Sequence, residues 1–247
     1  MSNINAAVDR LIAATTKNSS KPDELVTEID PSMFFKYNSV NLVIGRRGSG
    51  KTHMVLREIL KVMLLGHKEY TQLFYVTDKE HDDTFDKLSP LLLKHLQISW
   101  INTDEALELL QALEKGKASM DKHPEYRECL NAVGRDGLMP HTFIIFDDAI
   151  GLFSKTSNLA KKLYQTRQSR VTAFIILQDV QGLNSSMKSN VDSLVLFGGF
   201  SAHKFSILFY HLPPTSTQIT FDDYSSLSPQ DAVIVDFIDD ATNVLMR

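Results

Sequence analysis

Eight consecutive residues combine glycines, a lysine and a threonine at a spacing suited to holding phosphate groups. They fit the pattern G-x-x-x-x-G-K-[ST] and are Gly45, Arg46, Arg47, Gly48, Ser49, Gly50, Lys51 and Thr52. Glycines let the backbone curl so that successive N–H groups face the phosphates, and the following helix adds its positive N-terminal end. Lys51 is predicted to contact the β and γ phosphates of ATP, and the Thr52 hydroxyl to bind Mg²⁺.

An acidic pair at the end of an apolar run gives a second chemical signal. Residues 143–146 read Phe-Ile-Ile-Phe, and Asp147 and Asp148 follow them directly. Ligands of open α/β sheets bind beyond the carboxyl ends of the strands, so the pair should meet the phosphate loop in one crevice. We expect Asp147 to hold Mg²⁺ and Asp148 to orient or deprotonate the attacking water. The alternative is a pair that only caps the next helix or lies in a solvated turn.

The elements that must position these residues follow from the hydrophobic pattern. Short apolar runs bounded by polar or turn residues predict strands at residues 40–44, 73–77, 98–101, 142–147, 173–177 and 193–197. Helical patterns predict helices at residues 52–65, 103–117 and 158–167. This alternation is typical of an α/β fold in which helices cover both faces of a mostly parallel central sheet.

The segments outside this alternation predict the domain organisation. Residues 1–35 are rich in Ser, Thr and Asn and are predicted to form an N-terminal arm, whereas residues 36–247 form one P-loop ATPase domain. Residues 117–140 are polar and punctuated by glycine, as expected of an insertion. Apolar residues return at 232–238 and 244–247, which predicts a final hairpin at the sheet edge.

The long gap between Lys51 and Asp147 helps to choose among the branches of P-loop enzymes. The gap contains the strand pattern at residues 73–77, so the two motifs do not lie on strands adjacent in sequence. This favours the ATPase branch with an additional strand and a catalytic acid. A GTPase is disfavoured because no Asn/Thr-Lys-x-Asp motif that reads guanine is present. A small-metabolite kinase would need a substrate lid and a basic acceptor pocket, and no segment can be assigned to either.

Composition narrows the classes of partner and compartment. The formal net charge is −4, which argues against a chain that coats nucleic acid through overall positive charge. The single cysteine, Cys129, cannot form an internal disulfide and suits a reducing compartment. No apolar run approaches the roughly 20 residues of a membrane span, and the first residues have no signal-peptide pattern. The sequence therefore predicts an intracellular protein with no membrane partner.

Three features in a fixed order carry a resemblance to a known family. The acid pair Asp147-Asp148 comes first, then Arg167 precedes an apolar strand that ends at Gln178, and Asn190 precedes a further apolar strand. In this order, from about residue 40 to residue 197, the sequence resembles the genome-packaging ATPases of large DNA viruses and virophages. These proteins belong to the FtsK/HerA superfamily of DNA translocases.

The resemblance implies roles for two further residues. Gln178 would sense the γ-phosphate, and Arg167 would be the arginine finger that reaches the ATP of a neighbouring subunit. The chain departs from the family at Gln168, where His is frequent, and Arg170 is a rival finger. Gln178 could instead satisfy backbone groups at a strand end, and either arginine could complement a helix dipole.

The function implied by the resemblance is an ATP-driven motor that packages double-stranded DNA into a viral capsid. Such a motor would act as a homo-oligomeric ring in the cytoplasm of the host cell, in a viral factory or in the virion, with a capsid or portal protein as a further partner. DNA phosphates could be contacted by Lys155, Lys161, Lys162 and Lys188. The alternatives are a cellular-type motor for DNA transfer or end processing, and an ATP-regulated binding module with little turnover.

Overall fold

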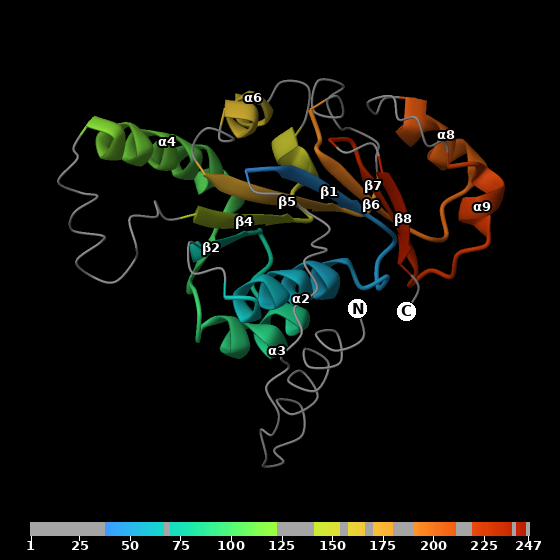
Figure 1. Cartoon of the computed structure of the whole chain (residues 1–247), viewed down its shortest axis with the longest axis horizontal. Helices are drawn as coiled ribbons and strands as arrows, with labels where there is room; N and C mark the ends of the chain where they lie inside the picture. The colour runs from blue at the N-terminus through green and yellow to red at the C-terminus, as the bar shows by residue number, and fades with distance from the viewer. Residues whose placement is uncertain are drawn as a thin grey trace, which may run out of the picture.

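The computed structural model describes residues 38–66, 70–122, 141–153, 158–165, 170–179, 190–210, 219–238 and 241–245. An eight-stranded sheet with the order β3-β2-β4-β5-β1-β6-β7-β8 runs through these residues (Figure 1). Its strands are β1 Val40–Ile44, β2 Tyr70–Val76, β3 Gln97–Ile101, β4 His141–Asp147, β5 Val171–Leu177, β6 Ser193–Phe197, β7 Ala232–Asp236 and β8 Ala241–Leu245. The first six strands pair in parallel, and β7 and β8 continue the sheet as antiparallel neighbours.

Helices cover both faces of the sheet. Figure 1 shows α2 and α3 on one face and α4 and α6 on the other, with α8 and α9 beside the end that carries β7 and β8. The bounds are α2 Lys51–Leu64, α3 Asp83–Leu92, α4 Ala106–Lys122, α6 Asn158–Gln165, α8 Ala202–Tyr210 and α9 Phe221–Ser225. Short 3₁₀ turns at Thr103–Glu105 and Ile150–Phe153 precede α4 and follow β4.

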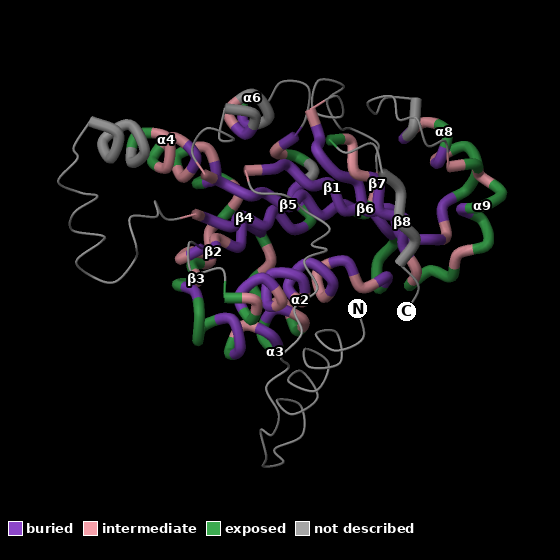
Figure 2. The backbone as a smooth tube through the Cα atoms, in the orientation of Figure 1, coloured by how far each residue is buried: buried purple, intermediate pink, exposed green. Residues whose placement is uncertain are grey.

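The central strands are apolar on both faces, because each face packs against helices. Every residue of β1, β5 and β6 is buried (Figure 2). Alternate side chains of β1 enter two separate cores. Leu42 and Ile44 pack with residues of α4, α6 and α8, whereas Val43 packs with α2 and α3. Near-continuous apolar runs of this kind are the expected composition of parallel strands that are covered on both sides.

The predicted fold class is confirmed, and most element boundaries differ from the predicted ones by a few residues. β1 and β6 have the predicted bounds, and the final antiparallel hairpin, β7 and β8, lies at the sheet edge as expected. The additional strand that separates β1 from β4 in the sheet is β5, which follows the acid pair in sequence. The strand in the sequence gap, β2, lies on the other side of β4.

Three helices, α3, α8 and α9, were missed, and several predicted features lie outside the described residues. Pro90 lies inside α3, and it obscured a helix that Asp82 caps by accepting hydrogen bonds from two backbone N–H groups. α8 was also missed, and α4 continues to Lys122, into the segment expected to be an insertion. The described residues do not include the N-terminal arm, the rest of that insertion, Cys129 or Arg167. No described helix has the length and apolarity needed to cross a bilayer.

Gly198 fixes the end of β6 against the turn before β7. Its N–H donates to Asp231 O over 2.9 Å. A Cβ at this position would lie 2.2 Å from Ser228 O and 2.9 Å from Leu227 O. Both obstacles are backbone atoms, so a larger residue cannot be accommodated by a side-chain rotation alone.

We therefore expect Gly198→Ala to destabilise the protein by about 1–3 kcal/mol, since the backbone around residue 228 must shift. Chemical denaturation followed by circular dichroism measures the change. Gly151→Ala is the matched control, because a Cβ there would meet nothing within 4 Å. Equal denaturation midpoints for the two variants would contradict the packing argument.

Candidate active site

The loop between β1 and α2 has the curled backbone that the phosphate-binding motif predicts. Gly48 and Gly50 have φ values of 78° and 92°, in the left-handed region that glycine enters without strain. Gly45 is constrained differently, because a Cβ there would lie 2.6 Å from Ser49 Oγ and 2.7 Å from Phe197 Cβ. The loop therefore needs glycine for its conformation and for its contact with the end of β6.

Lys51 lies at the first turn of α2 with its ammonium group turned back over the loop. Nζ donates hydrogen bonds of 2.9 Å to the carbonyls of Gly45 and Arg46. Burial lowers the pKa of Lys51, and the negative charges of Asp147 and Asp148 oppose this shift. The loop carbonyls hold the ammonium group beside the cleft in which the two acids lie.

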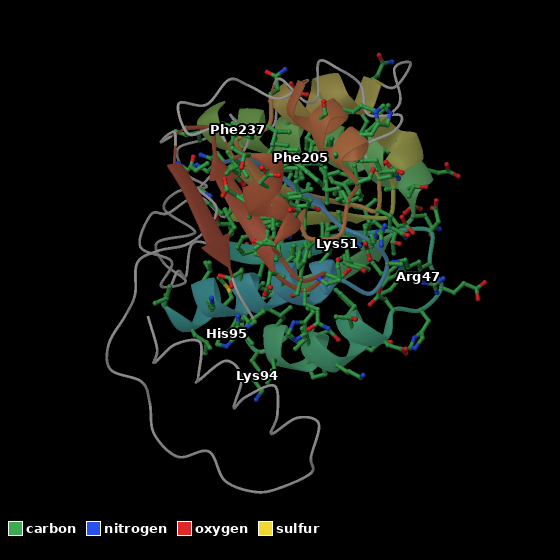
Figure 3. The ribbon with its side chains drawn as sticks, turned by 90° about the vertical axis from the view of Figure 1, so that its right-hand side faces the viewer. Arg47, Lys51, Lys94, His95, Phe205 and Phe237 are labelled. Carbon is green, nitrogen blue, oxygen red and sulfur yellow. The ribbon has the colours of Figure 1, made fainter. Side chains whose placement is uncertain are left out.

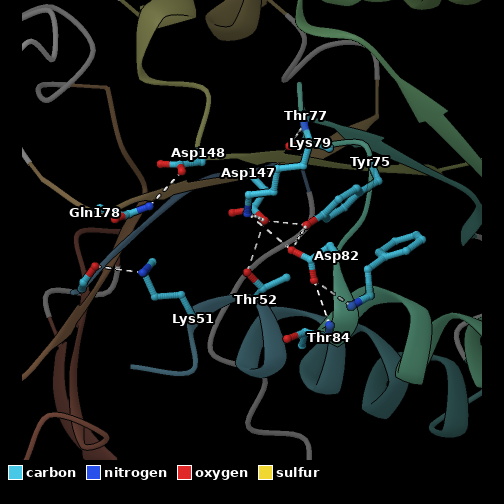
Figure 4. Close-up of polar contacts among 12 residues, drawn as sticks. Lys51, Thr52, Tyr75, Thr77, Lys79, Asp82, Thr84, Asp147, Asp148 and Gln178 are labelled. Carbon is cyan, nitrogen blue, oxygen red and sulfur yellow. Dashed lines mark hydrogen bonds and ion pairs between the residues drawn. The ribbon is translucent and has the colours of Figure 1, made fainter. Parts of the chain in front are cut away.

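Asp147, at the end of β4, has a side chain that is only 4% exposed. Its Oδ2 accepts hydrogen bonds from Tyr75 Oη at 2.5 Å and Lys79 Nζ at 2.8 Å, and a longer one from Thr52 Oγ1 at 3.4 Å (Figure 4). The structure therefore brings together Thr52 and Asp147, the two residues that the sequence assigned to Mg²⁺. It also adds a tyrosine and a lysine to the same carboxylate.

Asp148 turns the chain at the carboxyl edge of the sheet. Its φ of 59° lies in the left-handed region, which Asp enters more readily than most residues. Its exposed carboxylate accepts a 2.8 Å hydrogen bond from Gln178 Nε2, and Gln178 follows β5 directly. Because β4 and β5 are neighbouring parallel strands, the two residues meet above the strand ends.

These side chains share one cleft of about 730 Å³. From the predicted site, the cleft walls include Arg47, Lys51, Thr52, Asp147, Asp148 and Gln178. Two members of the predicted loop point elsewhere, since Arg46 packs toward Gly199 and the Ser49 hydroxyl is directed at Gly45. The cleft therefore joins the phosphate loop to the ends of β4 and β5.

No protein-family model and no curated protein matches the sequence, so similarity is found at the level of structure. The DNA-packaging ATPase B204 of Sulfolobus turreted icosahedral virus is similar, with a TM-score of 0.60 and 12% identity over 85% of this chain and 97% of B204. B204 of Sulfolobus turreted icosahedral virus 2, in complex with ATP-gammaS, has a TM-score of 0.60, 15% identity and the same coverage. ATPases 2 and 3 of EssC from Geobacillus thermodenitrificans have a TM-score of 0.56 and 13% identity, over 84% of this chain and 39% of the EssC chain.

The chain has the P-loop NTPase fold that B204 and the EssC ATPases share. The match spans 97% of B204. In this fold β5 lies between β1 and β4, and Gln178 follows the carboxyl end of β5.

Three polar residues around the Asp147 carboxylate were not predicted from the sequence, and they come from β2 and the connection to α3. Tyr75 and Lys79 contact Asp147, and both also approach Asp82 Oδ2, at 3.2 and 3.4 Å. Asp82 Oδ1 in turn caps α3. The sequence does show a polar segment directly after the strand predicted at residues 73–77. Assigning this segment to the site requires knowing that β2 lies beside β4.

Burial and neighbouring charges shift the pKa values of Tyr75, Lys79 and Asp82. Burial and the charge of Asp147 raise the pKa of Tyr75, so its hydroxyl remains a donor. Burial would lower the pKa of Lys79, but the hydrogen bond and charge of Asp147 outweigh it and the pKa is raised. Burial would raise the pKa of Asp82, but the Phe85 N–H and Lys79 outweigh it and the pKa is lowered. Lys79 is therefore cationic, and Asp82 anionic, near neutral pH.

The donor set of the cleft fits a magnesium ion. The hydroxyl of Thr52 and the carboxylate of Asp147 are oxygen ligands of the kind that Mg²⁺ prefers. Within the described ranges, no group of three His, Cys, Asp or Glu side chains could hold a metal by itself. Mg²⁺ usually binds through one or two protein groups, with phosphate oxygens and water completing its shell. Thr52 and Asp147 would hold it here.

The remaining residues of the predicted site lie away from the cleft or outside the described ranges. Arg170 directly precedes β5, at the opposite edge of the sheet, and the seven-residue strand spans about 20 Å. Asn190, in the turn before β6, is at that same far edge. Neither side chain can reach the cleft described here. Arg167 lies outside the described residues, so its role stays a prediction.

The four candidate lysines for DNA are not brought together among the described residues. Lys162 forms an ion pair with Glu114 on α4. Lys161 lies on α6, but its side chain is outside the description, and Lys155 and Lys188 are outside the described ranges altogether. The DNA-contact assignment of these lysines therefore stays a prediction.

Asp148→Asn should bind ATP normally and hydrolyse it about 10²–10⁴-fold more slowly, because the amide cannot accept a proton from water. Equilibrium binding of a fluorescent ATP analogue and a phosphate-release assay measure the two quantities. Asp104→Asn, an exposed acid outside the cleft lining, is the control. Loss of nucleotide binding by folded Asp148→Asn would mean that the roles of Asp147 and Asp148 are exchanged.

Proposed function

We propose that this chain is a Mg²⁺-dependent ATPase that works as a homo-oligomeric ring and drives double-stranded DNA into a viral capsid. The observation that carries the proposal is the cleft itself. Lys51 on its loop, the Thr52–Asp147 contact and the Asp148–Gln178 hydrogen bond occupy one cleft. These are the parts that phosphoryl transfer to water requires.

The likeness to B204 supports the packaging task. Two viral proteins with this fold are described as a DNA-packaging ATPase and a genome-packaging NTPase, and complexes of the latter contain AMP, AMPPCP or ATP-gammaS. The match covers 85% of this chain and 97% of B204. On that basis we propose for this chain the nucleotide binding and the DNA packaging described for B204.

Each residue of the cleft has a chemical task in this proposal. The Lys51 ammonium group exchanges the carbonyls of Gly45 and Arg46 for phosphate oxygens and stabilises the charge on the transferred group. Asp148 accepts a proton from the attacking water, and Gln178 fixes the orientation of its carboxylate. Mg²⁺, when bound by Thr52 and Asp147, would supply neutralisation of the developing charge on the phosphates.

Lys51→Ala is expected to lower ATP turnover by about 10²-fold or more, since a charge aimed at the transition state is lost. Turnover of the wild-type protein should rise when double-stranded DNA is added, and the variant should not respond. Lys87→Ala, an exposed lysine on α3 away from the cleft, should behave as the wild type. Near-normal turnover by Lys51→Ala would overturn the assignment of the phosphate loop.

Nuclease protection, measured beside ATP turnover, separates the packaging motor from its alternatives. Protection of DNA from nuclease, measured with purified capsids and ATP, is expected for a packaging motor. DNA-stimulated hydrolysis without protection at any capsid ratio would favour a cellular-type motor. ATP binding without turnover, with and without DNA, would favour a nucleotide-regulated binding module.

Arg167→Ala is expected to bind ATP nearly normally and to lower turnover on the order of 10³-fold, as the loss of an arginine finger does. If the finger acts on a neighbouring subunit, mixing this variant with Lys51→Ala restores activity at interfaces that pair an intact loop with an intact arginine. Native mass spectrometry verifies that mixed oligomers form. Mixed oligomers that stay inactive at every ratio would exclude the trans role of Arg167, and Arg170 would be tested in the same way.

A further inference from the structure

The Asp147 carboxylate already has a cationic partner, supplied by the chain. Lys79 Nζ lies 2.8 Å from Asp147 Oδ2, the same oxygen that Thr52 contacts at 3.4 Å. A carboxylate with an exposed fraction of 4% needs a counter-charge, because an unpaired buried charge is strongly destabilising. Lys79 provides this counter-charge at the position that the sequence assigned to the metal ion.

Lys79 is held less tightly than the group it compensates. Its side chain is 37% exposed, against 4% for Asp147, and its second partner, Asp82, is at 3.4 Å. The residue lies in the connection between β2 and α3 and borders the cleft that Lys51 and Gln178 also line. Figure 4 shows Lys79 and Lys51 on opposite sides of the Asp147–Asp148 pair. A rotation of its flexible stem can therefore move the ammonium group without moving the backbone.

The charges of the cleft favour one cation at a time on Asp147. A divalent ion at this carboxylate would repel the Lys79 ammonium group, and the ion pair would in turn weaken binding of the metal. Lys79 and Mg²⁺ are therefore competing partners of a single oxygen. An ammonium group displaced in this way has two kinds of strong acceptor in reach, the carboxylate of Asp82 and the phosphate oxygens of a nucleotide in the cleft.

We propose that Lys79 is a second phosphate-site lysine, which neutralises Asp147 when no metal ion is bound and contacts the nucleotide phosphates when Mg²⁺ takes its place. This assignment rests on the proposed nucleotide function of the cleft. It predicts that Lys79 sets how strongly nucleotide binding depends on Mg²⁺. Lys79 is a positioning residue for Asp147 in one state and a binding residue in the other.

The test is the dissociation constant of AMPPCP, measured by calorimetry with excess Mg²⁺ and with EDTA. In Lys79→Met the Asp147 charge is uncompensated in EDTA and repels the phosphates, so the ratio of the EDTA constant to the Mg²⁺ constant rises about tenfold over wild type. Lys79→Arg keeps the charge and stays within about twofold of the wild-type ratio. Lys94→Met is the matched control, since Lys94 is exposed, lies outside the cleft lining and is far from Lys51 in Figure 3.

A measurement on the wild-type protein makes the test independent of how Lys79→Met folds. With ¹⁵N-labelled lysine, the Nζ signal of Lys79, assigned by its loss in Lys79→Arg, should shift between the AMPPCP and Mg²⁺–AMPPCP states. An unshifted signal, or an unchanged ratio in folded Lys79→Met, overturns the proposal. Lys51→Ala separates this failure from a wider one. If Lys51→Ala binds AMPPCP as tightly as wild type, the proposed function of the cleft fails, whereas weakened binding by Lys51→Ala leaves that function intact.

Discussion

The buried carboxylate of Asp147 is the constraint on which the rest of the cleft depends. Removing an ionised carboxylate from water costs several kcal/mol unless donors and a counter-charge replace the lost hydration. Those donors come from three parts of the chain: Tyr75 from β2, Lys79 from the connection to α3, and Thr52 from α2. The contacts of this one carboxylate therefore tie β2, β4 and the start of α2 together.

The parts of the site that could be predicted from the sequence are those encoded in consecutive residues. The phosphate loop and the pair Asp147-Asp148 are local patterns, and the curled backbone at Gly48 follows from the glycine of the motif. Tyr75 and Lys79 could not be found in this way, because their role depends on β2 lying beside β4. Strand order is fixed by packing across the whole sheet, and no local spacing encodes it.

The direction of the strands, which no local pattern encodes, also decides which of the predicted residues lie at the cleft. Gln178 and Arg170 flank the same strand, but its two ends face opposite edges of the sheet, so Gln178 lies at the cleft and Arg170 lies away from it, and the predicted role of Arg170 at the ATP of a neighbouring subunit stays a prediction. The position of a residue in the sequence shows which strand it flanks. The direction of that strand decides at which edge of the sheet the residue lies. The prediction of α3 failed for a different reason, since Pro90 disfavours a helix locally while the burial of Phe85, Leu88 and Leu91 stabilises it.

Gly45 has a role in the packing of the fold as well as in the phosphate-loop motif. A side chain at this position would collide with Phe197, so the glycine is required by the packing of β1 against β6 regardless of whether a phosphate is bound. Gly48 has no such neighbour within 4 Å, and only its backbone conformation demands glycine. In a descendant that has lost catalysis, Gly45 would therefore persist as an architectural residue, whereas Lys51 would be free to drift. A glycine at this position thus indicates the packing of the fold, whereas a lysine at position 51 bears on phosphate binding.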